Sequence, residues 1–348
     1  MKRRTFLQAA LAAPASAMAA GACAAEPPTL GGARLRIGFL GMAHSHAAAK
    51  LQVVRESADW ELVGICEEDE SVRRRYVAGG VDAVWLERLL EQSQVIAVES
   101  NVEDHARHAK IALEAGKHIH LEKPPADTLE AFRDLVALAR EKNLLVQMGY
   151  MWRHHPAINA ALDAARKGWL GEVYLVRGVI NTHIGPERRP QWGRFRGGTL
   201  FELGCHLIDP LVRLLGRPAS VTATLKTHGP HQDRLADNTV AVFEFARALG
   251  IVSSTTLQPG APRHRCFEIL GANGTAVVRP IEPAELNVDL AKAAGPYRAG
   301  VQAVSLPPYR RYVGEFAELA DAVRRGAPLA ITPEQDLLVH ETLMRACA

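Results

Sequence analysis

The fold is decided by a stretch near the beginning of the chain, Leu35-Arg36-Ile37-Gly38-Phe39-Leu40-Gly41-Met42-Ala43-His44-Ser45-His46. Residues 35–40 form a short apolar run that is typical of a buried strand, and Gly41 permits a tight turn directly after it. The helical pattern that follows runs from about Ser45 to Glu56. A strand, a glycine turn and a helix in this order predict the first unit of a layered α/β sheet.

The same alternation continues to residue 149. Strand-like runs at 60–66, 81–84, 94–98, 118–121 and 144–148 are interspersed with helical patterns at 102–115 and 128–141. Strands that alternate with helices of this length are typical of α/β proteins, in which the strands run parallel. We therefore expect a doubly wound parallel sheet over residues 34–150.

The pattern changes after Gly149. Helices are expected at 156–166, 200–215, 312–324 and 333–346, and strands at 173–181, 222–225, 240–245, 252–257, 266–270 and 274–278. Successive strands joined by short turns predict a mostly antiparallel sheet with a helix or two on one face. Residues 151–348 are therefore expected to form a second domain of the α+β class.

Composition and charge restrict the classes of partner. The chain has 348 residues, 48% of them apolar, and a formal net charge of +3. Such a small net charge gives no support for binding nucleic acid or an acidic membrane surface. Beyond residue 25 the cysteines are Cys66, Cys205, Cys266 and Cys347, without CxxC spacing. Neither a disulfide framework nor a zinc site built from thiolates is expected.

Residues 1–25 have the features of an export signal. Lys2-Arg3-Arg4 gives a positive start, and an alanine-rich run and small-residue cleavage sites follow. The run is too short to span a membrane, and Arg3-Arg4-Thr5-Phe6-Leu7 resembles a twin-arginine signal, whose pathway exports folded proteins. An ordinary secretory signal with a chance arginine pair is the alternative. A periplasmic location is expected. A lipid anchor at Cys23 is not, because residues 20–22 lack the large apolar residue that such a site prefers.

The turn after residue 40 is a candidate dinucleotide site. Such a site needs a glycine for the turn, a second where the backbone approaches the pyrophosphate, and a small residue where helix meets strand. Gly41 fits the first role, but Ala43 and His46 take the second and third. Amides at the helix start can still hold a phosphate, with His44 or His46 as donors. The bulk of His46 is expected to hold the helix away from the strand. The alternative is that this turn binds nothing.

Glu67 favours the dinucleotide interpretation. It follows the strand at 60–66, where an acid hydrogen-bonds the adenine ribose hydroxyls in such folds. The same carboxylate would repel a 2′-phosphate, so NAD(H) is expected rather than NADP(H). In the alternative interpretation, Glu67, Glu68, Asp69 and Glu70 form a solvated acidic loop.

Four stretches resemble one family. They are the turn at 38–46, Glu122-Lys123-Pro124 with its lead-in Ala115-Gly116-Lys117-His118, the segment 150–156, and Glu202-Leu203-Gly204-Cys205-His206. In this order and spacing they resemble the Gfo/Idh/MocA oxidoreductases. The resemblance implies a Rossmann domain, an open-faced second sheet and frequent homo-oligomers formed through that sheet. It also implies a set of cofactor-binding residues, Gly38, Gly41, Ala43, His44, Glu67, Glu122 and Lys123.

The resemblance gives Lys123 and His206 catalytic roles. Lys123 ends a strand, before two prolines that stiffen the turn, and is implied to contact the nicotinamide and the substrate hydroxyl. Glu202 and His206 are spaced i, i+4 on an expected helix, so that Glu202 would orient the imidazole and raise its pKa for general-base work. The alternatives are a surface lysine and a buried structural histidine satisfied by a carboxylate.

Substrate contacts are expected from three residues, Arg153, His183 and Asp209. The loop at 187–196 contains four arginines and Trp192, and would rim a pocket for a sugar ring. A solvated basic loop is the alternative. A metal site drawing on His183, His206 and Glu202 lacks diagnostic spacing, so no metal is expected.

These observations predict an exported NAD(H)-dependent oxidoreductase that acts on a sugar, a polyol or a related carbohydrate. Free NAD(H) is not expected outside the cytoplasm, so the cofactor would be tightly bound and carried out with the folded chain. One alternative is redox-neutral glycoside cleavage by transient oxidation. A second alternative is a cofactor-free carbohydrate-binding or accessory protein.

Overall fold

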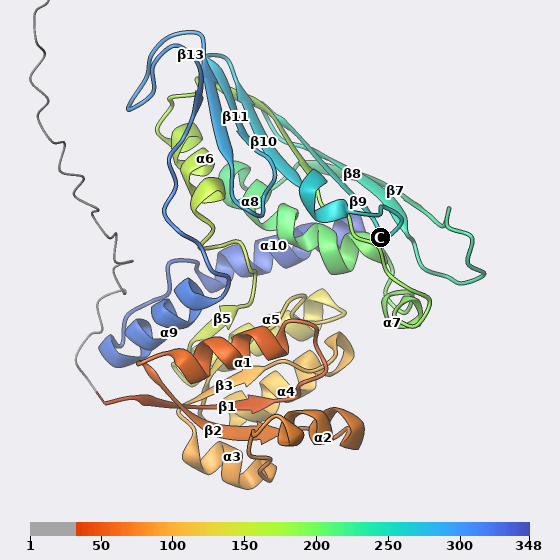
Figure 1. The fold of residues 1–348 in the computed structure, drawn as a ribbon, viewed down its shortest axis with the longest axis vertical. Helices are drawn as coiled ribbons and strands as arrows, with labels where there is room; N and C mark the ends of the chain where they lie inside the picture. Colours follow the sequence, from red (N-terminus) through yellow and green to blue (C-terminus); the bar gives the residue numbers. More distant parts are fainter. Residues whose placement is uncertain (1–32) are drawn as a thin grey trace, which may run out of the picture. The chain divides into compact units, whose positions relative to one another are not determined.

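A computed structural model describes residues 33–348, which form one compact unit (Figure 1). The expected export signal at 1–25 lies outside the described residues. Among the helices of the described part, none is long and apolar enough to cross a membrane. Two sheets organise the unit, and each is followed below from its strands.

The first sheet is entirely parallel. Its order is β2-β1-β3-β4-β5, and each strand pairs with its neighbours in parallel. Its strands are β1 (Leu35–Leu40), β2 (Trp60–Cys66), β3 (Val95–Val98), β4 (His118–Leu121) and β5 (Val146–Met148). Its helices are α1 (Ala47–Glu56), α2 (Glu70–Ala78), α3 (Leu86–Gln92), α4 (Val102–Glu114) and α5 (Leu129–Glu141). The doubly wound parallel sheet expected from the sequence is confirmed.

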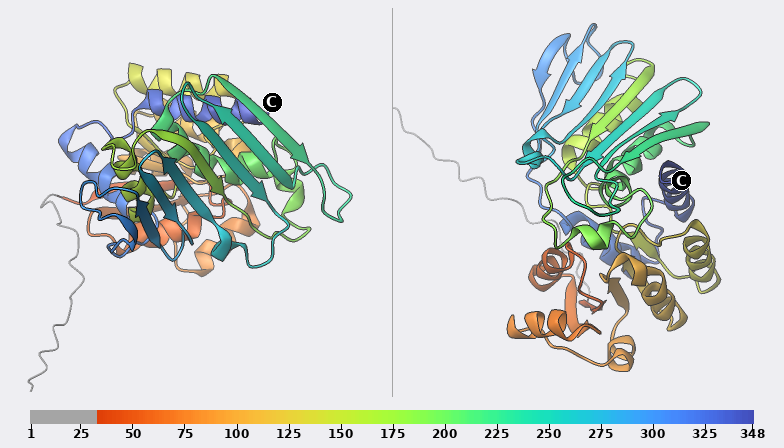
Figure 2. Two further views of the ribbon diagram at one scale, coloured as in Figure 1. Left: turned by 90° about the horizontal axis from the view of Figure 1, so that it is seen from above. Right: turned by 90° about the vertical axis from the view of Figure 1, so that its right-hand side faces the viewer.

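The second sheet has eight strands and is mixed. Its order is β13-β12-β11-β10-β6-β9-β8-β7, with β6 and β9 parallel and the other neighbours antiparallel (Figure 2). The strands are β6 (Val173–Val179), β7 (Ser220–Lys226), β8 (Asn238–Glu244), β9 (Leu249–Thr255), β10 (Cys266–Gly271), β11 (Gly274–Val278), β12 (Leu286–Leu290) and β13 (Gly300–Ala303). The expected α+β domain with a mostly antiparallel sheet is confirmed.

Helices cover one face of this second sheet. They include α6 (Pro156–Arg166) and α8 (Cys205–Leu215), while α7 (Arg189–Trp192), α9 (Val313–Arg325) and α10 (Pro333–Ala346) lie elsewhere around the two sheets. The approach is close, since a Cβ at Gly178 would lie 2.7 Å from a methyl carbon of Leu207 in α8. Along β8 buried and exposed residues alternate, as one covered face requires. Assembly through the other face stays a prediction.

Several sequence expectations need correction. Helices α2 and α3 were not expected, and residues 81–84 contribute only an isolated bridge between Ala83 and Ile65. The expected helix at 200–215 begins as a π-helical turn, Leu200–Gly204, before α8 starts. Strands β12 and β13 were also missed.

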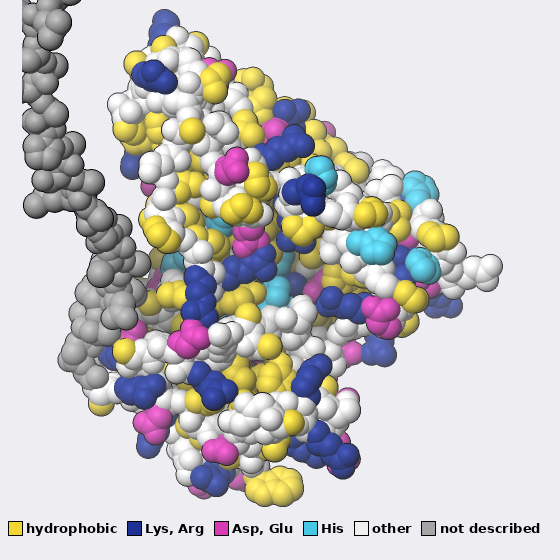
Figure 3. Space-filling view, viewed as in Figure 1, with side chains coloured by type: hydrophobic (Ala, Val, Ile, Leu, Met, Phe, Trp, Pro, Cys, Tyr) yellow, Lys and Arg dark blue, Asp and Glu magenta, His cyan; other side chains and the backbone are white. Residues whose placement is uncertain are grey.

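Lys/Arg and Asp/Glu side chains are interspersed over the face seen in Figure 3, which agrees with the small net charge.

The strand order reverses between β1 and β3, and Gly41 lies at this point. Ligands of open α/β sheets bind where the order reverses, outside the carboxyl ends of the strands. Gly41 has φ +76°, and a Cβ built on it would lie 2.4 Å from the Cβ of Ser100, which follows β3. Both the backbone conformation and the close approach therefore require glycine here.

Replacing Gly41 with alanine should destabilise the chain more than the same change at Gly116. Gly116 has nearly the same φ, +74°, but a Cβ at this residue would have no neighbour within 4 Å. Gly116→Ala should therefore lower the free energy of unfolding by about 1 kcal/mol, from backbone strain alone. Gly41→Ala adds overpacking against Ser100 and should lower it by about 3 kcal/mol. Denaturant unfolding measures both, and equal losses would contradict the close approach at Gly41.

Candidate active site

The candidate site lies at the carboxyl ends of the strands of the first sheet. Gly41 follows β1, Glu67 follows β2, Glu99 follows β3, and Glu122 and Lys123 follow β4. Parallel strands bring these ends to one edge of the sheet, so the four turns converge. The second domain adds Glu202 from the π-helical turn and His206 from the first turn of α8.

A buried lysine joins three of these elements. Nζ of Lys50, from α1, donates to Oε1 of Glu99 at 2.7 Å and is in direct contact with Oε2 of Glu122. All three side chains are fully buried. Burial alone would raise the pKa of Glu122, but Lys50, with His46 and His44, holds that pKa well below its usual range. Burial raises the pKa of Glu99 despite Lys50. Glu122 is therefore the ionised partner of Lys50.

Lys123 is paired with Glu202. Its Nζ donates to the main-chain oxygen of Glu202 and to Oε1 of the same residue, both at 2.9 Å. Burial alone would lower the pKa of Lys123, but the attraction of Glu202 raises it. Burial opposes ionisation of Glu202 too, yet Lys123 and His44 lower its pKa to about 2. The expected role of Glu202 in orienting His206 is thus not what the structure shows, because its carboxylate is held by Lys123.

His206 has no orienting partner of its own. The side chain is buried, and its Nδ1 makes no hydrogen bond to any described residue. Its ring lies 5.6 Å from that of Trp152 and 5.9 Å from that of His46, measured between centroids. Burial, with the charge of Lys123 nearby, lowers its pKa well below the usual range. The sequence predicted a raised pKa, and that prediction is wrong, because no carboxylate faces the ring closely enough to offset burial.

The two histidines of the turn point into the site. His46 Nδ1 lies 3.2 Å from Oε2 of Glu122, and His44 Nε2 lies 3.5 Å from Oε1 of Glu202. His46 therefore does not wedge α1 away from β1, as its bulk suggested. Helix α1 packs through buried Ala47 and other residues, and the imidazole of His46 lies at the end of β4.

The geometry of one cluster would allow a metal ion. Nitrogen atoms of His44 and His46 and an oxygen of Glu122 all lie within 4.8 Å of one another. However, Lys50 already places its ammonium group on the same oxygen of Glu122. A cation at this position would be repelled by that ammonium, so we assign no metal to the cluster.

Glu67 supports the turn. Its Oε2 accepts a hydrogen bond from the amide of Met42 at 2.5 Å, and its Oε1 accepts one from the amide of Asp69 at 2.8 Å. The side chain is buried, so it is not part of a solvated loop. The amides of Ala43 and Ser45 make no hydrogen bond to another described residue and are available to a phosphate.

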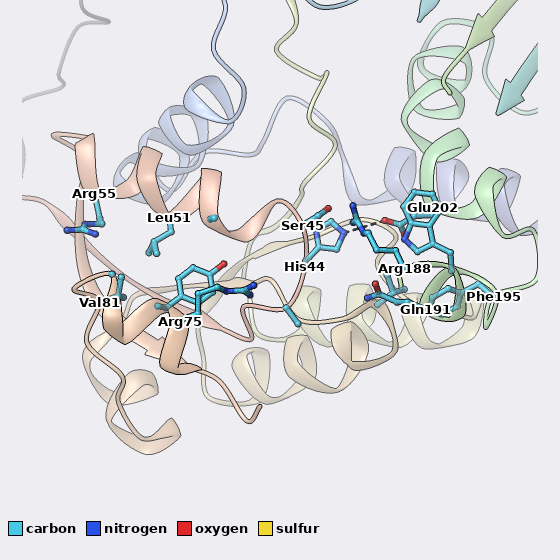
Figure 4. A pocket seen from close by; sticks show the side chains of 16 residues that line it. His44, Ser45, Leu51, Arg55, Arg75, Val81, Arg188, Gln191, Phe195 and Glu202 are labelled. Carbon is cyan, nitrogen blue, oxygen red and sulfur yellow. Dashed lines mark ion pairs between the residues drawn. The ribbon is translucent and has the colours of Figure 1, made fainter. Parts of the chain in front are cut away.

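A cavity of about 580 Å³ opens along this turn (Figure 4). Leu51, Arg55 and Val81 line one end, His44 and Ser45 line the middle, and Glu202 lies at the other end. The cavity volume, the free amides of the turn and the buried acid after β2 fit a dinucleotide. Of the cofactor-binding positions inferred from resemblance, Ala43 and His44 line this cavity. Gly41 and Glu67 shape its turn, whereas Gly38 packs closely against Leu89 of α3 and does not face the cavity.

Segment 185–198, here called the strap, crosses from the second domain to this cavity. It carries α7, and Arg188, Gln191, Trp192 and Phe195 form one wall of the cavity. Gln191 Nε2 donates to Oδ1 of Asn101 at 2.8 Å, which ties the strap to the start of α4. Of the four arginines expected around a sugar ring, only Arg188 lines the cavity. Arg189 is buried and bonded to Asp233 and Asp237.

The expected substrate residues are placed elsewhere. Arg153 and Asp209 are buried and paired with each other at 2.7 Å, and Arg153 also pairs with Asp336 of α10 at 2.5 Å. Their charges are satisfied within the protein, so a substrate role for them is not supported. His183 is exposed and forms an isolated bridge with Leu257, outside the cavity. A buried ion pair explains Arg153 and Asp209 better.

Sequence reasoning missed Lys50, Glu99 and Gln191. Glu99 directly follows a strand, which is the same signal that singled out Glu67 and Glu122. Lys50 lies among the buried residues of α1, so a lysine within an apolar helical stripe was the available signal. Nothing in the local pattern around Gln191 predicts its contact with Asn101.

Comparison with known proteins agrees with this geometry. Residues 35–150 match an oxidoreductase family with an NAD-binding Rossmann fold, and residues 158–277 match the Gfo/Idh/MocA C-terminal domain. Levoglucosan dehydrogenase of Pseudarthrobacter phenanthrenivorans is 26% identical over 320 residues, covering 79% of this chain and 80% of that protein. D-glucoside 3-dehydrogenase of Escherichia coli is 30% identical over 177 residues, covering 46% and 48%. The chain thus spans about half the length of the second relative.

A solved structure shows the same fold. Levoglucosan dehydrogenase in complex with NADH and levoglucosan superimposes with a TM-score of 0.77 at 21% identity, covering 90% of this chain and 96% of that one. The two family models together match both domains. The chain therefore belongs to the Gfo/Idh/MocA family of oxidoreductases, and residues 35–150 form its NAD(H)-binding Rossmann domain.

Proposed function

We propose that this protein is an exported NAD(H)-dependent oxidoreductase that acts on a CH–OH group of a sugar, a polyol or a related carbohydrate. The observation that carries the proposal is the buried pair of Lys123 and Glu202, which come from different domains and whose Glu202 lines the end of the dinucleotide cavity, with buried His206 one helical turn after Glu202. The names of relatives that act on levoglucosan and D-glucosides support the carbohydrate class. The residues at 1–25 support export.

His206 is suited to take the hydroxyl proton. Because its pKa is lowered by burial, the imidazole is neutral at physiological pH and has a lone pair for a proton. Bound NAD⁺ supplies the hydride acceptor for the carbon-bound hydrogen. His206 and the dinucleotide site thus divide the two hydrogens of the alcohol between them.

Lys123 is suited to stabilise the developing alkoxide. An ammonium group has three N–H donors, and two of the acceptors around Lys123 belong to Glu202. One donor therefore stays available to a substrate oxygen. The pair with Glu202 keeps the lysine protonated and fixes its direction, so a positive charge is in place before the alkoxide forms.

The strap supports tight retention of the cofactor. It walls the cavity on the side of the second domain, and its helix α7 is held from two sides, by Gln191 to Asn101 of the first domain and by Arg189 to Asp233 of the second. A dinucleotide in the cavity would lie against this wall and gain contacts from it. A protein that is exported in the folded state needs such retention, because it cannot collect NAD(H) again outside the cytoplasm.

We expect NAD(H) to accompany the purified protein. We also expect that Lys123→Ala and His206→Ala each lower turnover about 10²–10⁴-fold while the cofactor stays bound. Mass spectrometry of the denatured protein measures the cofactor, and oxidation of a panel of sugars and glycosides measures turnover. Absence of dinucleotide together with no binding of added NAD(H) would contradict the proposal. Release of an aglycone without net change in NADH would point to redox-neutral glycoside cleavage.

Weakening the strap should speed loss of the cofactor. Gln191→Ala removes one hydrogen bond, worth about 1 kcal/mol, so NADH should dissociate about five-fold faster, with turnover at saturating NAD⁺ preserved. Stopped-flow displacement followed by NADH fluorescence measures the dissociation rate. Arg247→Ala, which removes an exposed ion pair with Glu172, is the control and should leave the rate unchanged. An unchanged rate in Gln191→Ala would show that the strap does not retain the cofactor.

A further inference from the structure

His46 occupies an unusual place for an imidazole. It is the residue at the third position of the dinucleotide turn, where the fold normally has glycine, and it directly precedes α1. Its side chain reaches the end of β4, next to Glu122, and its ring lies 5.9 Å from that of His206 and 5.7 Å from that of Tyr312. No function proposed above uses this imidazole.

Glu122 fixes the orientation and the tautomer of His46. The carboxylate lies 3.2 Å from Nδ1 and is itself ionised and held by Lys50. An ionised carboxylate only accepts hydrogen bonds, so Nδ1 carries the hydrogen and Nε2 keeps a lone pair. An imidazole that a carboxylate orients in this way, with its second nitrogen free to accept a proton, is typical of a general base. His206, in contrast, has no hydrogen-bond partner at Nδ1 among residues 33–348.

The imidazoles of His46 and His206 differ in how far they are exposed to solvent. The side chain of His46 is 15% exposed, whereas His206 is 2% exposed and Lys123 is 1% exposed. A proton taken up by His206 is therefore enclosed, and it faces the charge of Lys123. The ring of His46 lies 5.9 Å from that of His206 and combines contact with solvent and a carboxylate partner.

We propose that His46 is a relay residue, which receives the proton that His206 takes from the substrate hydroxyl and passes it to water. In the oxidation, the C–H and O–H bonds of the alcohol break and a C=O bond forms. The electron pair leaves with the hydrogen from carbon to NAD⁺, and the hydroxyl proton moves to His206, then to His46, then to solvent. The inference rests on the proposed oxidoreductase function and adds the exit of the proton.

Two substitutions at one position test the relay. His46→Gln keeps an N–H donor for Glu122 but cannot carry a proton, and His46→Gly restores the usual glycine of the turn. Both should lower kcat about 10²–10³-fold without a rise in KM, and both should bind NADH as tightly as the original protein or more tightly. Added imidazole should restore a substantial part of kcat in His46→Gly, which leaves space for it, and none in His46→Gln.

A structural role alone would give a different result. If His46 merely supported the turn, His46→Gln would keep its kcat, or both variants would lose NADH affinity and imidazole would restore nothing. Either result would overturn the relay. Unchanged NADH binding, measured by fluorescence titration, also separates this failure from failure of the proposed function, in which the unsubstituted protein itself would bind no dinucleotide.

The tautomer of His46 gives a readout that needs no substrate. Nitrogen-15 NMR of histidine-labelled protein should show the hydrogen of His46 on Nδ1, and Glu122→Gln should remove this preference. A hydrogen on Nε2 in the unsubstituted protein would contradict the relay, because the lone pair would then face Glu122 instead of the site. Lys50→Met should shift the same signals as Glu122→Gln, since Glu122 would lose the ammonium that keeps it ionised.

Discussion

The contact between the Lys50 ammonium and the Glu122 carboxylate is the interaction on which the rest of the site depends. It joins α1 to the end of β4 through two fully buried side chains, where an unpaired charge would cost several kcal/mol. Glu99 adds the end of β3 to the same point. The surrounding backbone is shaped for this cluster, because a Cβ at Gly149 would lie 2.7 Å from Nζ of Lys50. The position of the nucleotide turn follows from this contact, since the turn leads directly into α1.

A second buried ion pair joins the two domains. Lys123 belongs to the first sheet, and Glu202 belongs to the π-helical turn of the second domain. That turn places the main-chain oxygen and the carboxylate of Glu202 both at 2.9 Å from one nitrogen, Nζ of Lys123. The pair therefore gives the ammonium group of Lys123 a fixed direction. It also removes Glu202 from the set of groups that could orient His206.

Periodicity predicted the fold well because most strands and helices bury a clear apolar face. Helices α6 and α10 have the expected bounds, and the expected order of strands through β11 is found. Helix α2 was missed because none of its residues is buried, so it has no apolar stripe to detect. Residues 81–84 look like a strand because most of them are apolar, yet only Ala83 among them bridges Ile65.

The candidate site was predictable only in part. Lys123 and His206 were recognisable from local motifs. The ion pairs of Lys50 with Glu122 and of Glu202 with Lys123 join residues that are distant in sequence, so no local motif indicates them.

The expectation for His206 failed for a reason that bears on the chemistry. Sequence spacing gave it a carboxylate one turn away, and that carboxylate is held by Lys123. A protonated His206 would be buried beside this ammonium with no negative partner, so the cationic form is disfavoured. Such a group can take a proton only if it can also pass it on quickly. The negative charge near the rings lies instead on Glu122, which faces His46. Burial lowers the pKa of His46 as well, to about 3, and the carboxylate of Glu122 offsets only part of this effect, so that His46 would carry the proton only in passing from His206 to water.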